Sequence, residues 1–292
     1  MFELVILSFE NVGKSYGAIR ALESFSFEVG RDEIVAVLGP NGAGKTTALD
    51  IGVGLRRPDS GSVRLFGLSP RAIAARRRLG VTPQESGFPD SLRAGEIVEF
   101  AAAHFRCRPT RAREVLSDFG LDDLVKRPAG SLSGGQARRL ALALAFVGEP
   151  EIAVLDEPTT GLDIEARRRA WHVIRAAGAG RAILFSTHHL EEAEALASRI
   201  VVIDRGRKIF DGAAADLRER FGTRRLSYVG KPLERHTLGF VANITTDRRT
   251  TTVATNDTDA YVRALVVTGT PFSELEISPA SLEEAFLSMT RR

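Results

Sequence analysis

Residues 33–47 read EIVAVLGPNGAGKTT, and most of the architecture follows from them. The run EIVAVLG (33–39) is continuously apolar after its first residue, which is typical of a strand buried in a parallel sheet. The remainder matches G-x-x-x-x-G-K-[ST], where glycines let backbone N–H groups turn toward phosphate oxygens. The helix pattern KTTALDIGVGL (45–55) follows. A strand, a glycine-rich loop and a helix in this order predict a phosphate-binding site.

Individual side chains of residues 39–47, the phosphate loop, have distinct roles in this motif. Lys45 is expected to reach the β- and γ-phosphates of a nucleotide, and Thr46 to offer its hydroxyl to Mg²⁺. A tight glycine turn without a ligand is the alternative. The flanking strand and helix favour the phosphate site.

Alternating strand and helix patterns extend this motif into an α/β domain. Further buried strands are expected at 79–84, 151–158 and 181–189, and a helix follows each of the last two. Such alternation predicts a parallel sheet with helices on its faces. Short alternating segments within residues 2–38 predict an antiparallel β subdomain beside it.

Two segments depart from that alternation. Residues 91–126 have helical periodicity and little strand character, which predicts a helical subdomain at about 88–135. From about residue 223 the chain becomes polar and threonine-rich, and it holds no candidate catalytic cluster. We therefore expect a nucleotide-binding domain over 1–222 and a small α+β domain over 223–292 that serves folding, dimer contact or regulation.

Composition excludes several classes of protein. The chain has 292 residues, a formal net charge of +3 and one cysteine, Cys107. No internal disulfide or cysteine metal cluster can form, and no nucleic-acid partner is expected from so small a net charge. The longest apolar run, residues 140–147, is far shorter than the roughly 18 residues that a membrane span needs. If the protein works at a membrane, another subunit is expected to supply the span.

Carboxylates and a histidine stand where two of the buried strands end. Asp156 and Glu157 follow the run IAVL, and His188 follows AILFST. Parallel strands bring their carboxyl ends to one edge of a sheet, beside the phosphate loop. There Asp156 suits Mg²⁺, and Glu157 can polarise an attacking water. His188 is expected to point at the γ-phosphate, and its neighbour His189 to face elsewhere.

Gln84 and Tyr16 give weaker signals. Gln84 ends the segment 79–84 and can contact Mg²⁺ or its water, but a solvated loop amide would look the same. Tyr16 precedes a turn and can stack on adenine or simply pack on the sheet. Neither role follows from the residue's own position.

The segment LSGGQ (132–136), which we call the signature segment, makes a second glycine-rich helix start. Its place between the phosphate loop and LDEP (155–158) resembles the signature of ABC-type ATPases. The resemblance covers residues 3 to about 220, with the motifs in the family's order. It implies a P-loop NTPase fold of the ABC type, with antiparallel β and helical subdomains. It also implies an ATPase that uses ATP and Mg²⁺.

The resemblance assigns the site residues as well. Hydrolysis would involve Glu157, His188 and Gln84, and Mg²⁺ would bind at Thr46, Gln84 and Asp156. The ATP contacts that it implies come from the aromatic loop, the phosphate loop, the signature segment and the D-loop: Tyr16, Gly39, Asn41, Gly42, Gly44, Lys45, Thr46, Thr47, Ser133, Gly134, Gly135, Gln136 and Asp163.

Partners and location follow from the same resemblance. In the family two ATP-binding domains pair head to tail, so Ser133, Gly134 and Gly135 would contact the γ-phosphate held by the other subunit. We expect a homodimer closed by two ATP molecules. The ending SPASLEEAFLSMT (278–290) resembles ATPase subunits of ABC-2-type exporters, with an ordinary amphipathic helix as the alternative. This implies a separate ABC-2-type permease and a cytoplasmic location at the inner face of the membrane.

Two positions depart from the family pattern, and two other functions are alternatives. Ile164 follows GLD where proline is frequent, and Ala137 follows the signature segment where a larger residue is common. Neither would touch the nucleotide, so hydrolysis is still expected. A soluble ABC ATPase of translation or DNA repair is one alternative, but such proteins usually carry two ATP-binding domains or long coiled coils. A small-molecule kinase or GTPase is the other, which LSGGQ, LDEP and His188 disfavour.

Overall fold

The computed structural model describes residues 5–84, 87–222, 224–233, 241–255, 257–278 and 281–290, apart from the side chain of Ala242. The chain divides into two compact units, Met1–Asp211 and Gly212–Arg292. Helix α8 (Ala214–Phe221) falls in the second unit, beyond Asp211 but ahead of the boundary expected between residues 222 and 223. Where the functional domains divide stays a prediction. Residues 279–280 of the exporter-like ending lie outside the described residues.

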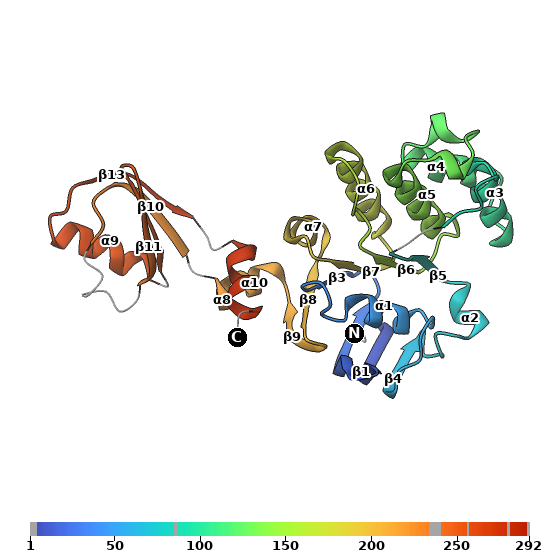
Figure 1. The fold of residues 1–292 in the computed structure, drawn as a ribbon, viewed down its shortest axis with the longest axis horizontal. Helices are drawn as coiled ribbons and strands as arrows, with labels where there is room; N and C mark the ends of the chain where they lie inside the picture. Colours follow the sequence, from blue (N-terminus) through green and yellow to red (C-terminus); the bar gives the residue numbers. More distant parts are fainter. Residues whose placement is uncertain are drawn as a thin grey trace. The chain divides into compact units, whose positions relative to one another are not determined.

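A six-stranded sheet in the order β5-β6-β7-β3-β8-β9 lies at the centre of the first unit (Figure 1). Its strands are β3 (Ile34–Leu38), β5 (Leu79–Thr82), β6 (Ile152–Asp156), β7 (Ala182–Thr187), β8 (Arg199–Asp204) and β9 (Arg207–Gly212). The first five of these run parallel to their neighbours. Strands β6 and β7 are buried along their whole length, which explains why their sequences are almost continuously apolar. The predicted parallel sheet is confirmed.

A second sheet in the order β2-β1-β4 is antiparallel. It consists of β1 (Val5–Tyr16), β2 (Ile19–Gly30) and β4 (Ser60–Leu65). Helix α1 (Lys45–Gly52) packs against β1 and β4 as well as β6. One apolar core therefore joins both sheets through this helix, and the predicted antiparallel β subdomain is confirmed.

A group of helices interrupts the alternation, as predicted. Helices α3 (Ala94–His104), α4 (Arg111–Asp118) and α5 (Gly134–Val147) contact one another, and α5 also packs on β5 and β6. Short helices lie at α2 (Ile73–Arg76), η1 (Asp122–Leu124) and η2 (Ala129–Ser131). Helices α6 (Ile164–Ala177) and α7 (Leu190–Leu196) follow β6 and β7.

The second unit contains a four-stranded antiparallel sheet in the order β11-β12-β10-β13. Its elements are α8, β10 (Arg224–Gly230), β11 (Val241–Asp247), β12 (Thr250–Thr255), α9 (Thr258–Val267), β13 (Phe272–Ser278) and α10 (Leu282–Thr290). Leu226 and Tyr228 of β10 pack with Val253, Tyr261 and Leu265. In neither unit do the described residues form a helix long and apolar enough to cross a membrane.

Candidate active site

The phosphate loop joins the end of β3 to the start of α1. Gly44, the N-cap of α1, has a φ of 107°, and a Cβ there would meet the Ala21 carbonyl oxygen at 2.3 Å. A Cβ on Gly39 would meet the Ile203 carbonyl oxygen at the same distance. Only glycine fits at either position. The two glycines let the loop pass close to these carbonyls and end at the N-terminus of α1. The first N–H groups of a helix have no partner within the helix, which is the geometry that binds a phosphate.

The Lys45 side chain is hydrogen-bonded to the backbone at the start of this loop. Its Nζ donates to the carbonyl oxygens of Gly39 (2.9 Å) and Pro40 (3.1 Å), and it lies 4.0 Å from Glu157 Oε1. The residue is 6% exposed. Burial lowers the pKa of Lys45 from its ordinary 10.5, while the charges of Glu157 and Asp156 oppose that shift. A buried cation beside a phosphate-binding loop is suited to balance the charge of a polyphosphate.

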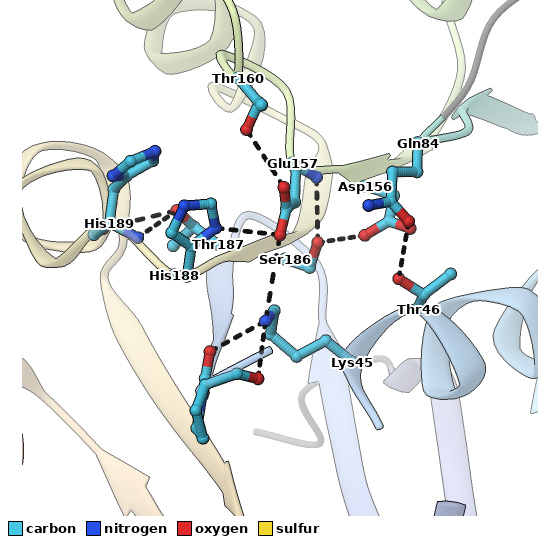
Figure 2. Close-up of polar contacts among 12 residues, drawn as sticks. Lys45, Thr46, Gln84, Asp156, Glu157, Thr160, Ser186, Thr187, His188 and His189 are labelled. Carbon is cyan, nitrogen blue, oxygen red and sulfur yellow. Dashed lines mark hydrogen bonds and ion pairs between the residues drawn. The ribbon is translucent and has the colours of Figure 1, made fainter. Parts of the chain in front are cut away.

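Glu157 lies between two basic side chains (Figure 2). Its Oε1 is 3.0 Å from His188 Nδ1, and its Oε2 accepts from the Thr160 hydroxyl at 3.2 Å. Burial alone would raise the pKa of Glu157, but His188, Lys45 and Thr160 together hold it below its ordinary 4.5. The carboxylate is therefore ionised at neutral pH and available to orient or deprotonate a water.

Asp156, Thr46 and Gln84 bring oxygen atoms to the opposite side of the site (Figure 2). The Thr46 Oγ1 donates to Gln84 Oε1 at 3.5 Å, and Asp156 Oδ1 accepts from the Ser186 hydroxyl. Hydroxyl, amide and carboxylate oxygens are the ligands that Mg²⁺ prefers, and Mg²⁺ usually completes its shell with water and phosphate. These residues fit the metal. Among the described residues no group of three or more His, Cys, Asp and Glu forms a metal site of its own.

His188 and His189 lie differently with respect to Glu157. His188 reaches Glu157, whereas His189 lies outside that contact and its ring centroid is 4.0 Å from that of His188. Burial, and then the neighbouring His188, lower the pKa of His189 from 6.5. His188 is the histidine that faces the site.

Ser186 and Arg138 belong to this site and were missed from the sequence. The Glu157 N–H donates both to the hydroxyl oxygen of Ser186 (3.0 Å) and to its carbonyl oxygen (3.2 Å). The Ser186 hydroxyl in turn donates to the Asp156 carboxylate. Arg138 is 7% exposed and donates to the carbonyl oxygens of Asp156 and Glu157, among others. Only sheet order puts Ser186 next to Asp156, so no motif could have revealed it. Arg139, the neighbour of Arg138, donates instead to the carbonyl oxygens of Phe119 and Gly120, away from the site. The arginine pair in the sequence therefore did not show which residue supports the site.

The signature segment forms the N-terminus of α5. The Gln136 N–H donates to Ser133 Oγ (3.3 Å), and Gln136 Oε1 accepts from the Ser133 N–H (2.9 Å). This reciprocal cap stabilises a helix start by about 1 kcal/mol. Ser133 and Gly134 are exposed. In the described part of the chain no hydrogen bond or ion pair joins residues 133–136 to the phosphate loop of the same subunit.

Asp163 and Tyr16 also lie apart from the contacts around Glu157. Asp163 caps α6 by accepting from the Ala166 N–H at 2.8 Å. Tyr16 ends β1 with 40% of its surface exposed, and Arg56 lies over its ring at 5.4 Å from the centroid. The structure thus brings six of the predicted residues together: Lys45, Thr46, Gln84, Asp156, Glu157 and His188. Tyr16, Asp163 and the signature segment lie outside this network of contacts.

Known proteins are similar to this chain over most of its length. Residues 22–160 match the family described as ABC transporter. The chain is 35% identical to the daunorubicin resistance ATP-binding protein DrrA3 of Streptomyces coeruleorubidus, over 97% of this chain and 95% of that protein. It is 42% identical to the Nod factor export ATP-binding protein I of Burkholderia orbicola, over 71% of this chain and 70% of that protein.

Solved structures agree at the level of the fold. An ATP-binding subunit of an ABC transporter aligns with a TM-score of 0.68 and 28% identity, over 74% of this chain and 93% of that one. The dimeric ATP-binding cassette MJ0796 bound to ADP and Pi aligns with a TM-score of 0.66 and 26% identity, over 71% of this chain and 98% of that one.

Proposed function

The chain belongs to the ABC transporter family, as an ATP-binding and ATP-hydrolysing subunit, and from this premise we propose that it powers export through a separate membrane permease. The observation that carries the proposal is the carboxylate of Glu157, held between His188 and Lys45 at the mouth of a phosphate loop. Its pKa lies below its ordinary value. Such a group is ready to act on a water that attacks the γ-phosphorus.

Export rests on the relatives. The drug-resistance protein spans nearly the same length as this chain, and the Nod factor protein carries export in its name. A soluble role in translation or DNA repair is disfavoured by these names. The longest described helices, α5 and α6, have 14 residues each, so the described residues contain no long coiled coil of the DNA-repair kind.

Hydrolysis follows from the roles of a few side chains. The phosphate loop and Lys45 hold the β- and γ-phosphates. Glu157 accepts hydrogen bonds from the attacking water and takes its proton, while the bond between the γ-phosphorus and ADP breaks. His188 fixes the Glu157 carboxylate and contacts the γ-phosphate. In this site catalysis is mainly positioning and charge stabilisation.

Mg²⁺ would be held by Thr46, Gln84 and Asp156, and the bound ion would neutralise charge on the β- and γ-phosphates. The oxygen donors of these three residues support this assignment. Ser186 keeps Asp156 oriented through its hydroxyl, as outer-shell partners of metal ligands commonly do.

A second copy of the chain would complete the site. The N-terminus of α5 is exposed, and among the described residues its cap engages the N–H groups of Ser133 and Gln136. This leaves the N–H groups of Gly134 and Gly135 to bind an anion. We propose that Ser133, Gly134 and Gly135 bind the γ-phosphate held by the partner subunit, with Asp163 and Tyr16 near the same nucleotides. Two ATP molecules then close the dimer, and their hydrolysis releases it.

The permease is expected to be of the ABC-2 type and to dock beside Gln84 and the helical subdomain. Leu92 (42% exposed) and Phe100 (78% exposed) offer apolar surface there. Such exposed apolar side chains are consistent with a protein partner at this subdomain. This docking would hold the subunit at the inner face of the membrane.

Glu157→Gln tests the catalytic assignment and the dimer together. The variant should bind ATP with nearly normal affinity, hydrolyse it at least about 100-fold more slowly, and elute as an ATP-dependent dimer in size exclusion. Adding Ser133→Arg to Glu157→Gln should abolish that dimer while the monomer still binds ATP.

Glu114→Gln is the matched control, because this carboxylate pairs with Arg108 at the surface of the helical subdomain. It should leave turnover and oligomeric state unchanged. Full turnover and a monomeric state of Glu157→Gln in the presence of ATP would refute the assignment. Recovery of the wild-type protein from membranes with a ribosome, and without a permease, would refute the export role.

A further inference from the structure

One buried arginine has all of its donors engaged by the backbone of the catalytic site. Arg138 lies on α5, five residues beyond Ser133 in the chain, and is 7% exposed. Its guanidinium donates to carbonyl oxygens of two segments: Nε to Pro158 (3.2 Å), Nη1 to Pro83 (2.6 Å) and Gln84 (3.2 Å), and Nη2 to Asp156 and to Glu157 (2.8 Å). A guanidinium has five N–H donors, and these five contacts match that number.

Contacts with carbonyl oxygens alone are unusual for a buried arginine that only stabilises the fold. A buried cation is normally neutralised by a carboxylate in direct contact, yet Arg138 forms no ion pair within 4.0 Å among the described residues. Its charge is instead shared among carbonyl dipoles, while the charges of Asp156, Glu157 and Glu192 act from farther away. The contacts therefore constrain the course of the backbone more than they stabilise a charge pair.

The two segments that Arg138 ties together are those that present Gln84 and Glu157. Pro83 and Gln84 directly follow β5, and Asp156, Glu157 and Pro158 end β6 and begin the next loop. Both are fixed to α5, whose N-terminus is the signature segment. Through these contacts a shift of α5 would move the Glu157 backbone, and a misplacement of about 1 Å changes catalytic rates strongly.

We propose that Arg138 is a positioning residue that couples the signature segment to Glu157 and Gln84. This inference rests on the proposed function, in which the signature segment binds the ATP of the partner subunit. Docking of that ATP on α5 sets the position of the Glu157 carboxylate through the Arg138 contacts. Each subunit thereby completes its own catalytic geometry when it engages its partner's nucleotide.

The sequence supplies a matched pair of arginines for the test. Arg138→Lys keeps the charge but reduces five donors in a planar fork to three at one point. Arg139→Lys makes the same change at the next residue, where Nη1 donates to the Phe119 and Gly120 carbonyls of the helical subdomain. Only the first should affect catalysis.

The chain also holds a spectroscopic reporter, its single tryptophan. Trp171 Nε1 donates to Glu192 Oε1 (3.3 Å), which also accepts from the hydroxyl of buried Thr159 (2.7 Å). Because Thr159 directly follows Pro158, a displaced loop should change the emission of Trp171. This measurement needs no turnover.

Steady-state ATPase kinetics of the full chain should then separate the two variants. For Arg138→Lys we expect cooperative unfolding, an ATP affinity and KM within about threefold of wild type, an ATP-dependent dimer in the Glu157→Gln background, and a kcat lower by about tenfold or more. Its Trp171 emission should shift. Arg139→Lys should keep kcat within about twofold and leave the emission unchanged.

Two results would overturn the inference: a kcat of Arg138→Lys within about twofold of wild type, or a loss of ATP affinity as large as the loss of kcat. If Arg138→Lys does not fold, Arg138→Gln, which buries no unpaired charge, takes its place. Failure of both to fold makes Arg138 a structural residue only. A wild-type chain without ATPase activity would instead refute the proposed function, while the Trp171 emission would still report on Arg138.

Discussion

Glu157 has a backbone conformation that non-glycine residues rarely adopt. Its φ is 48°, in the left-handed region, directly after the extended residues of β6. Two hydrogen bonds from its N–H to Ser186 and one from Arg138 to its carbonyl hold this conformation. The turn sends two consecutive carboxylates to different partners, Asp156 to Ser186 and Glu157 to His188. Local strain of this kind is typical of functional sites, where the surroundings impose it.

His189 makes stability depend on pH at the same place. Burial and the neighbouring His188 lower its pKa in the folded chain below 6.5. The unfolded chain therefore takes up a proton first as the pH falls, so acidification through about pH 6.5 and below favours unfolding. At higher pH both states are neutral and this effect vanishes.

His189→Gln should accordingly lose less stability on acidification than the wild type. Melting temperatures measured from about pH 8 to about pH 5.5 should diverge by on the order of 1–2 °C, because the ring is only half-buried. Parallel curves for the two proteins would contradict the assignment. His189→Gln should also retain ATPase activity, since this ring does not touch Glu157.

Among the elements that support the site, strand β5 and helix α5 pack against each other at a glycine. A Cβ placed on Gly80 of β5 would lie 2.0 Å from the Ala145 carbonyl oxygen of α5. The missing side chain lets the helix that carries Ser133 and Arg138 lie directly on the strand that precedes Gln84. This spacing sets the distance over which the Arg138 contacts form.

Gly80→Ala should destabilise the first unit by about 1–3 kcal/mol, because added volume in a close-packed core forces the backbone apart. Chemical denaturation should reveal the loss as a lower midpoint with an unchanged slope. Gly87→Ala is the control, since a Cβ there meets nothing within 4 Å. Equal stability of the two variants would show that α5 can move away at no cost.

The elements of the first unit were largely predictable because apolar runs and chemical motifs occur together in the sequence there. Apolar runs marked β3, β6 and β7, and the phosphate loop, LDEP and His188 each followed such a run. Because parallel strands end at one edge of the sheet, their order along the chain was enough to place these motifs together. In the second unit β10 (RRLSYVG) and β13 (FSELEIS) were missed, since charged and small residues dilute their alternation.

The contacts of Ser186 and Arg138 could not be predicted in the same way. Ser186 contacts Asp156 because β7 pairs with β6 in a register that places these two residues opposite each other. Arg138 donates to carbonyl oxygens of residues that lie more than fifty positions before it and about twenty positions after it in the sequence. A backbone acceptor carries no side-chain identity, so no sequence pattern marks such a partner.

At the scale of the whole molecule, the chain is two units, and α8 belongs to the second. Leu217 of α8 is fully buried, and α8 packs with α10, where Ser288 Oγ donates to the Phe221 carbonyl at 2.7 Å. Glu157 contacts Lys45, Arg138, Thr160, Ser186 and His188, which all lie before Asp211. The nucleotide chemistry should therefore need nothing beyond β9.

Two truncated chains test this division. A chain that ends at Ala213 keeps β9 (Arg207–Gly212) whole and removes α8 together with α10. It should unfold cooperatively and bind ATP with an affinity within about twofold of the full chain.

A chain that ends at Gly222 keeps α8 but loses α10, and the apolar surface of Leu217 is exposed. It should bind ATP equally well but aggregate more readily, as light scattering would measure. Loss of cooperative unfolding in the shorter chain alone would place the boundary at residue 222, because α8 would then have to support the first unit.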